Sequence, residues 1–331
     1  LTNGTSMTSE QGSIRLESYQ SDVVSLASLS AADLVLLQAD NGAVFSMADV
    51  QATDVTISAA SGVEISGNVE AASSFNAIAS AGNIAVSGDT IEGDTLSLTA
   101  LAGSIDASSS FIGQSVDIDA ANNLTLTGDV TAATSALAGA GGELTLTAGN
   151  GPLVVNGDLD GTTILLTSTA GAIDATSNMS ATTISFDAGT DLTLAGDITA
   201  VDTLTLDATD ALDYSGNATS QGDVILTGQS ITMNSGSLNG AAVEVTSPGA
   251  VALTGDVNTA GDLKVTSTSG TVALDVAAAI DGDILVTAEH DVALAGEFSA
   301  SAIEALSAQG DVTQSGSMVA TGEVAVNANA G

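Results

Sequence analysis

A short sequence pattern recurs about every 20 residues along the whole chain. Segments that begin at Val251, Val272, Val292 and Val312 read VALTGDV, VALDVAAAI, VALAGEF and VTQSGSM. The same break recurs back to the first residue and divides the 331 residues into 16 units. Fifteen of these units have 19 to 22 residues, and one, residues 124–152, has 29. A fixed period of this length is typical of an array of repeats stacked along one axis.

The unit at residues 192–211, LTLAGDITAVDTLTLDATDA, shows how one repeat is expected to fold. Its first and third residues are leucines that alternate with threonine and alanine, which is the period of a half-buried strand. The Gly-Asp pair at 196–197 breaks this strand, because glycine tolerates a positive φ and aspartate favours turns. Another strand is predicted at residues 204–207. Two or three short strands fill the unit and leave no room for a helix.

Aligned units place like residues in columns, and each turn would cover the apolar face of the turn before it. We therefore predict an all-β fold, a right-handed parallel β-helix (β-solenoid) with about 16 turns of roughly 20 residues. The handedness follows from the general preference of parallel crossovers. The opening inward column includes Val63, Ile84, Ile105, Leu124, Leu153, Ile173 and Leu192, and the column after the next corner includes Val69, Phe111, Val130, Leu159, Met179, Ile198, Leu238, Val257, Phe298 and Met318.

No composition shift or linker divides the chain, so residues 1–331 are predicted to form a single solenoid array, an excerpt of a longer chain. The additional residues of the 29-residue unit are expected within 131–142, as a surface loop. That loop is either a small bulge or hairpin, or slack. Hydrophobic residues make up 44% of the chain but aromatic residues only 2%, which predicts a thin core of Val, Ile, Leu and Ala.

The charge excludes one large class of partner. Lys264 and Arg15 are the only basic residues apart from one histidine, against 40 acidic residues, for a net charge of -38. If each turn rises about 4.8 Å, the array is roughly 77 Å long and carries one negative charge per about 2 Å, close to the charge density of duplex DNA. Such a surface repels nucleic acid and anionic membranes and attracts cations. No segment reaches the roughly 20 apolar residues of a membrane helix, so no membrane insertion by this segment is expected.

Parallel β-helices include polysaccharide lyases and hydrolases, so the predicted fold is compatible with catalysis. Acid–base chemistry needs a carboxylate perturbed in a cleft. The near pairs Asp117/Asp119 and Asp207/Asp210 are predicted to face outward into solvent. His290 is the only histidine and lies in a predicted turn. We therefore expect no enzyme activity, no catalytic residues and no required cofactor.

Cation binding is the remaining chemistry. Acids on adjacent turns, about 4.8 Å apart, could share Ca²⁺ or another cation, because carboxylate oxygens are its preferred ligands. The candidates are Asp117, Asp119, Asp281 and Asp283. The nonapeptide of calcium-binding β-rolls, GGxGxDxUx, is absent. Further oxygen ligands could come from the recurrent corner residues Asp89, Asp129, Asp158, Asp197 and Asp256.

Four degenerate strings carry a family resemblance: LTLTGDVTA from Leu124, LTLAGDITA from Leu192, ELTLTAGNG from Glu143 and VALTGDVNTAGDLKVTS from Val251. In this repeat style the chain resembles the rods of filamentous-haemagglutinin-type adhesins, exported by two-partner secretion, and some autotransporter passengers. The resemblance implies a right-handed β-helix on the bacterial cell surface, used in attachment, biofilm cohesion or cell contact. The Asn-Pro-Asn motifs of the family's secretion domain do not occur in this sequence, and no family binding residues map onto it.

These observations predict a non-enzymatic extracellular structural rod of a large bacterial surface adhesin. The alternative is a self-assembling extracellular filament or sheath subunit, and a polysaccharide-active β-helix enzyme is the third reading. Unpaired strand groups at an open β-helix end favour pairing. The expected partners are therefore a continuation of the same chain or a second copy bound end to end, besides host or neighbouring-cell ligands that the sequence does not identify.

Overall fold

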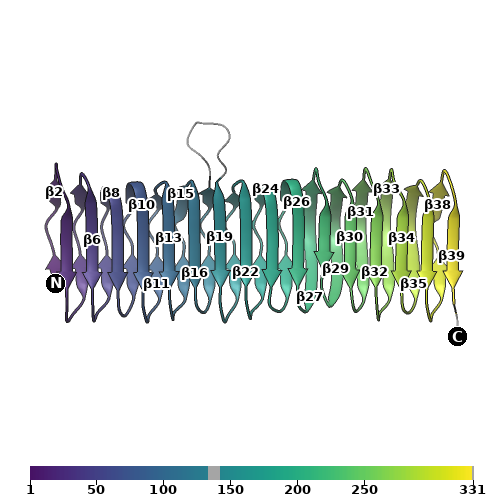
Figure 1. The fold of residues 1–331 in the computed structure, drawn as a ribbon, viewed down its shortest axis with the longest axis horizontal. Coiled ribbons are helices and arrows are strands. Elements are labelled where there is room, and N and C mark those ends of the chain that lie inside the picture. Colours follow the sequence, from purple (N-terminus) through teal and green to yellow (C-terminus); the bar gives the residue numbers. More distant parts are fainter. Residues whose placement is uncertain (133–141, 330–331) are drawn as a thin grey trace. The chain divides into compact units, whose positions relative to one another are not determined.

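The computed structural model describes residues 1–132 and 142–329, and every regular element in these ranges is a β-strand. The chain forms two compact units, Leu1–Gly171 and Ala172–Gly331. Within each unit, strands of successive coils lie side by side (Figure 1). The all-β solenoid with about 16 turns is thereby confirmed. Its handedness and its organisation as a single array stay predictions.

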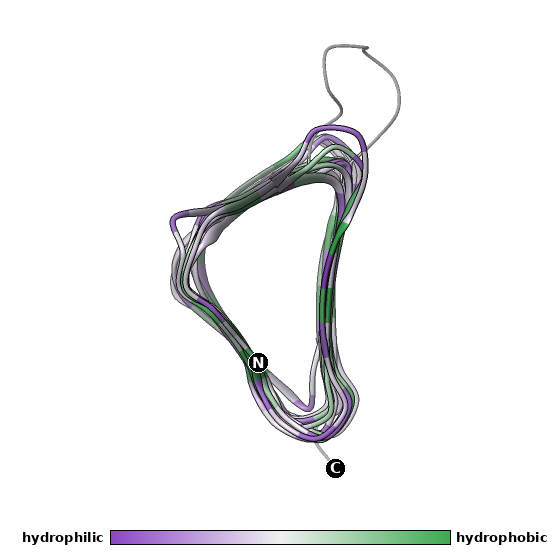
Figure 2. Ribbon diagram, turned by 90° about the vertical axis from the view of Figure 1, so that its left-hand side faces the viewer, coloured by the Kyte–Doolittle hydropathy of each residue, from purple (hydrophilic) through white to green (hydrophobic). Residues whose placement is uncertain are grey.

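Each coil has three sides (Figure 2). We call them, in chain order, the first, second and third face. The coil that starts at Val63 is an example: β9 (Val63–Ile65) lies on the first face, and β10 (Val69–Ala79) covers the second and third. A register shift between Ala71 and Ser74 marks the corner inside β10. The strand predicted at 204–207 belongs to the third face.

In the first unit, the short first strands end before the first corner. All pairings between its successive coils are parallel. The first face holds β1 (Thr2–Asn3), β4 (Val23–Ser25), β7 (Val44–Ser46), β9, β11 (Ile84–Val86), β14 (Ile105–Ala107), β17 (Leu124–Leu126) and β20 (Leu153–Val155). The second face holds β2 (Met7–Ser9), β5 (Leu29–Ala31), β12 (Thr90–Glu92), β15 (Ser110–Gly113), β18 (Val130–Ala132) and β21 (Leu159–Asp160). The third face holds β3 (Ile14–Ser18), β6 (Leu34–Ala39), β13 (Thr95–Ala100), β16 (Ser115–Ala120), β19 (Glu143–Ala148) and β22 (Thr163–Ser168). Two longer strands, β8 (Val50–Ala59) and β10, cover both of these faces.

In the second unit, five strands run through the first corner without a break. The pairings between coils are again parallel. The continuous strands on the first and second faces are β27 (Ala211–Ser220), β29 (Ser230–Gly240), β31 (Val251–Thr259), β33 (Val272–Ile280) and β35 (Val292–Ala300). The others are β23 (Ile173–Ala175), β25 (Leu192–Leu194) and β37 (Val312–Gln314) on the first face, β38 (Ser317–Ala320) on the second, β24 (Met179–Ala188) and β26 (Ile198–Ala208) on the second and third, and β28 (Val224–Thr227), β30 (Val243–Ser247), β32 (Leu263–Ser267), β34 (Ile284–Ala288), β36 (Ile303–Ser307) and β39 (Val324–Ala328) on the third.

Alternate residues of every face point into the coil and form the core. Val63, Ile84 and Ile105 follow one another in register on the first face and are at most 3% exposed. The outward residue between two buried ones stays in contact with solvent, as the period of two requires. Except for Met318, which is half-buried in β38, the columns predicted from the sequence are buried.

The predicted loop within residues 131–142 is only partly described. Thr131 and Ala132 belong to strand β18, and Gly142 is buried next to β19. Residues 133–141 lie outside the described part of the chain, so the choice between a bulge or hairpin and slack stays open.

Candidate functional site

The first pair of predicted cation ligands lies on the third face of the first unit. Asp117 and Asp119 both point outward from β16, as expected. Burial raises the pKa of Asp117 above its usual value, and the charges of Asp119 and Glu143 add to the rise. Mutual repulsion of this kind is reduced by a proton or by a cation. Calcium or other cations at this pair remain a prediction.

The second predicted pair, Asp281 and Asp283, flanks Gly282 at the corner before β34. Both residues are exposed. The carbonyl oxygen of Asp281 accepts a hydrogen bond from Ser301 Oγ (2.8 Å), and the N–H of Asp283 donates to Asp262 Oδ1 (2.9 Å). Within residues 1–132 and 142–329, no group of three or more His, Cys, Asp or Glu side chains is placed to hold a metal ion.

Asp and Asn side chains at the first corner form hydrogen bonds between coils that the sequence analysis did not predict. Asn68 donates its N–H to Asp49 Oδ1, and Asp89 donates its N–H to Asn68 Oδ1, both at 2.9 Å. The side chain of one coil thus binds the main chain of the next. The same bond joins Asp158 N–H to Asp129 Oδ1 at 2.9 Å and Asn217 N–H to Asp197 Oδ1 at 3.0 Å. The sequence contains a signal for these bonds, because Asn or Asp recurs at this corner in successive units.

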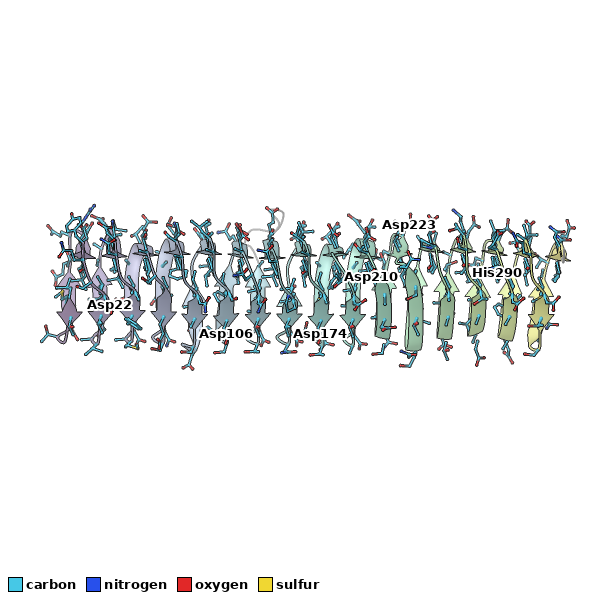
Figure 3. All side chains as sticks on the ribbon, turned by 90° about the horizontal axis from the view of Figure 1, so that it is seen from below. Asp22, Asp106, Asp174, Asp210, Asp223 and His290 are labelled. Carbon is cyan, nitrogen blue, oxygen red and sulfur yellow. The ribbon has the colours of Figure 1, made fainter. Side chains whose placement is uncertain are left out.

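The remaining singled-out residues are spread over the second unit. Asp207 faces Asp187 of the preceding coil in register. Burial raises its pKa above the usual value, and the charge of Asp187 adds to the rise. Asp210 and His290 lie in turns, as Figure 3 shows together with other outward acids.

Tyr214 is the largest fully buried side chain of the described core, and it lies in an inward column, in register with Leu194. Burial raises the pKa of its phenol far above the usual value, with a contribution from Asp197. Its hydroxyl has no hydrogen-bond partner within the described residues. The phenol therefore stays protonated and belongs to the packing of the coil.

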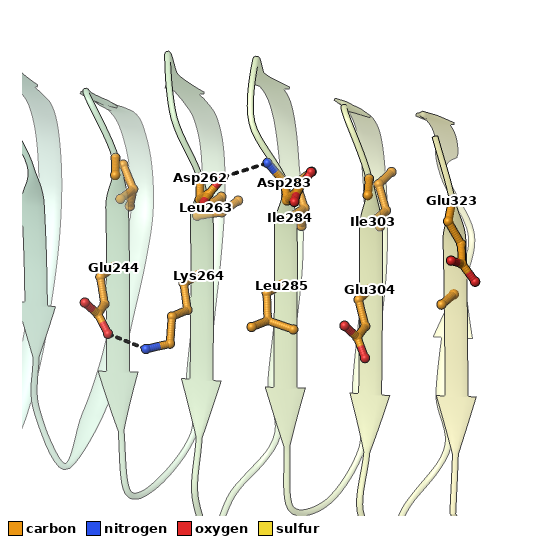
Figure 4. Close-up of a pocket in the computed structure, with 14 residues that line it drawn as sticks. Glu244, Asp262, Leu263, Lys264, Asp283, Ile284, Leu285, Ile303, Glu304 and Glu323 are labelled. Carbon is orange, nitrogen blue, oxygen red and sulfur yellow. Dashed lines mark hydrogen bonds and ion pairs between the residues drawn. The ribbon is translucent and has the colours of Figure 1, made fainter. Parts of the chain in front are cut away.

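A groove of about 460 Å³ lies on the third face of the second unit (Figure 4). We call it the acidic groove. It crosses five successive coils, from β30 to β39, and two rows of outward residues form it. One row consists of Ala242, Asp262, Asp283, Ala302 and Glu323, and the other of Glu244, Lys264, Leu285, Glu304 and Ala325.

The groove combines one satisfied charge pair with several carboxylates that lack a cation. Lys264 Nζ lies 2.7 Å from Glu244 Oε1, one coil away, and both side chains are about half exposed. Asp262 accepts the N–H of Asp283. Five carboxylates and one ammonium group line the groove. The half-buried side chains of Leu285 and the alanines lie between these charges, so the groove can hold a cation with an aliphatic part.

Sequence reasoning did not find the acidic groove. Of the residues that line it, only Asp283 is among the site candidates named from the sequence. The available signal was the position of Lys264 one repeat after Glu244 and two repeats before Glu304, next to alanines at positions where neighbouring units carry larger residues. Small residues beside large ones make a hollow in an otherwise flat sheet face.

Across residues 1–132 and 142–329, the structure has no helix long and apolar enough to cross a membrane. No family model matches the chain, and no curated protein or solved structure is significantly similar to it.

Proposed function

We propose that this chain is a non-enzymatic structural segment of a large bacterial surface adhesin, located outside the cell, where it serves attachment, biofilm cohesion or contact between cells. Each coil would act as a spacer module. The resemblance of its repeats to filamentous-haemagglutinin-type rods supports this proposal.

The observation that carries the proposal is the use of polar side chains between coils. Asp49, Asn68 and Asp89 form successive side-chain to main-chain bonds from one coil to the next. Ser267 Oγ donates to the carbonyl oxygen of Gly249 and accepts the N–H of Gly270. Side chains that hold adjacent coils in register are what a repeating spacer needs, because its stability is the sum of coil and interface contributions.

Location and role are tested on cells that produce the protein. Antibodies against this chain should label intact cells, and removal of residues 251–291, two whole coils, should preserve labelling while it changes attachment. Removal of residues 251–281 is the matched control, since a fraction of a coil shifts the register and should abolish folding. Labelling that requires permeabilised cells, or attachment that is unchanged without the chain, would contradict the proposal.

Two further measurements separate the other hypotheses. Depolymerisation of any member of a panel of acidic and neutral polysaccharides would replace the proposal by an enzyme. The mass of the intact polypeptide distinguishes the adhesin from the filament subunit: several hundred kilodaltons supports the adhesin, whereas about 32 kDa supports the subunit.

A further inference from the structure

We propose that the acidic groove docks a lysine-bearing segment of a partner protein, with the lysine side chains lying across the third face and their ammonium groups on Glu304, Glu323 and Asp283. This inference goes beyond the structural role proposed above and does not depend on it.

The groove already contains one example of the proposed contact. Lys264 extends along the sheet face and places its Nζ 2.7 Å from Glu244 Oε1 on the preceding coil (Figure 4). The aliphatic part of a lysine can cover apolar surface while the ammonium group stays at a carboxylate. A partner's lysine would repeat this arrangement one or two coils further along the same rows.

The carboxylates on that side of the groove have no cation from this chain. Glu304 and Glu323 are exposed, and the two basic residues of the sequence, Arg15 and Lys264, are paired with Glu17 and Glu244. A like-charged array of this kind attracts a cationic partner and speeds its association. The complementary charge must therefore come from another molecule.

The lining favours an aliphatic ammonium group over a metal ion. Asp262 and Asp283 stand on adjacent coils, but within the described residues no third acid joins them to hold a metal ion. Asp283 and Glu323 stand two coils apart on the same row, about 10 Å at 4.8 Å per coil, whereas calcium ligands lie about 2.4 Å from the ion. Between them Ala302 opens a notch, and the half-buried Leu285 borders it. A lysine side chain supplies methylene groups for Leu285 and Ala302 and three N–H donors for the acids.

The length of the groove fits a short extended segment. Four steps between five coils cover about 19 Å, and six extended residues cover about 20 Å. Alternate residues of such a segment point to the same side, so lysines at every second position would all face the groove.

The test measures binding of a fluorescein-labelled peptide, acetyl-Lys-Val-Lys-Val-Lys-Val-amide, to the full chain by fluorescence anisotropy near physiological salt. The double variant Glu304→Gln/Glu323→Gln should weaken binding about five- to tenfold, as expected for the loss of two partly exposed charge pairs. Leu285→Thr should weaken it about threefold. Lys264→Glu should strengthen it, because a competing ammonium group is replaced by a carboxylate; misfolding cannot produce this gain.

The matched control removes two exposed carboxylates from the first face of the same unit, Asp174→Asn/Asp213→Asn. It should change the affinity less than twofold. An equal loss in the control would show diffuse attraction to the acidic surface and would overturn the proposal. So would equal binding of the peptide with acetylated lysines, or weaker binding by Lys264→Glu. None of these results bears on whether the chain lies on the cell surface, so failure here and failure of the proposed function are distinguishable.

Discussion

The two units close the same three-sided coil with two kinds of corner, used in different proportions: Ser168 ends a third strand in the first unit, and Ala188, Ala208 and Ala288 end third strands in the second. In six successive coils of the first unit, the third strand ends in a buried alanine, whereas three coils of the second unit place a buried serine there. At the alanine corner a main-chain bond joins the coils, from Ala121 N–H to the carbonyl oxygen of Ala100 (2.9 Å), and the alanine side chain itself forms no hydrogen bond. The alanines are Ala39, Ala59, Ala79, Ala100, Ala120 and Ala148, and the serines are Ser247, Ser267 and Ser307.

The serine corners add side-chain bonds to this main-chain contact. Ser307 Oγ donates to the carbonyl oxygen of His290 (2.7 Å) and accepts the N–H of Gly310 (2.8 Å). One hydroxyl thus connects the end of a strand to the preceding corner and to its own turn. The alanine corners are thus stabilised by packing of a methyl group, and the serine corners by hydrogen bonds of a hydroxyl group.

The first corner differs in its backbone. In the first unit it is a loop with Asn and Asp side chains that bind the next coil, as Asp197 also does in the second unit. In five coils of the second unit continuous strands pass through it instead. Gly236, Gly255 and Gly296 have φ values of +99°, +124° and +101° at this place. The inward columns are therefore common to both units, whereas the side chains and the backbone conformation of the corners vary from coil to coil.

The largest effect is predicted where the units agree. Leu126→Asp in the first unit and Leu194→Asp in the second place a carboxylate at positions that are at most 2% exposed. Each should lower the free energy of unfolding by about 4 kcal/mol or more, because a charge without a partner is buried and apolar contacts are lost. Urea denaturation with hydrogen exchange of the adjacent coils measures both. A mild effect in one unit only would show that the columns are not equivalent.

Two glycines at the first corner show whether steric contact or backbone conformation requires glycine there. A Cβ at Gly88 would collide with the carbonyl oxygen of Gly67, and one at Gly255 with that of Gly236. Only Gly255 also has a positive φ. Gly255→Ala should therefore destabilise the protein more than Gly88→Ala, by about 1–2 kcal/mol, the cost of the left-handed conformation.

Gly161→Ala is the control for these two alanine variants. An added Cβ there would meet Gly142 O at 3.4 Å, which is ordinary contact. Thermal unfolding should show little change for this variant. If Gly88→Ala and Gly255→Ala lower the free energy of unfolding equally, the close approach of coils alone explains the need for glycine. The positive φ of Gly255 then contributes nothing to the difference in stability.

Much of the fold was predictable because it depends on residues that repeat. The inward columns of Val, Ile and Leu follow from the period of two within strands and of about 20 between coils. The strand on the second face, such as the part of β26 at 198–200, and the corner bonds were not predicted. A hydrogen bond such as Asn68 N–H to Asp49 Oδ1 joins residues that only the register brings together. Likewise, Ala302 makes a notch only because Leu285 and Glu323 stand on the neighbouring coils.

The serine corners should contribute a medium effect. Ser267→Ala removes a bond to the carbonyl oxygen of Gly249 (2.5 Å) and one from the N–H of Gly270 (3.0 Å) at a side chain that is 1% exposed. The expected loss is about 1–3 kcal/mol, since a buried partner is left unsatisfied. Ser168→Ala in the first unit removes one such bond, to Gly151, and should cost less. If urea denaturation shows equal losses of unfolding free energy for Ser267→Ala and Ser168→Ala, the second hydrogen bond of Ser267 adds no stability.

The smallest effect is predicted for pH, at one acid in each unit. Burial together with neighbouring carboxylates raises the pKa of Asp117 and of Asp207 above the usual value of 3.8. The folded state then binds protons more readily than the unfolded state, so these groups destabilise the fold above their raised pKa, and the penalty disappears as the pH falls through that pKa toward 3.8.

Asp117→Asn and Asp207→Asn should therefore raise the melting temperature slightly at pH 7, by an amount that corresponds to about 0.5 kcal/mol or less for such exposed sites. Near pH 3 the advantage over the wild-type chain should vanish. Added salt weakens repulsion between exposed charges but leaves the contribution of burial, so 0.5 M NaCl should reduce the gain only in part. A gain for Asp207→Asn that disappears completely in salt would assign the rise in pKa to the facing Asp187 rather than to burial, and would separate this acid from Asp117.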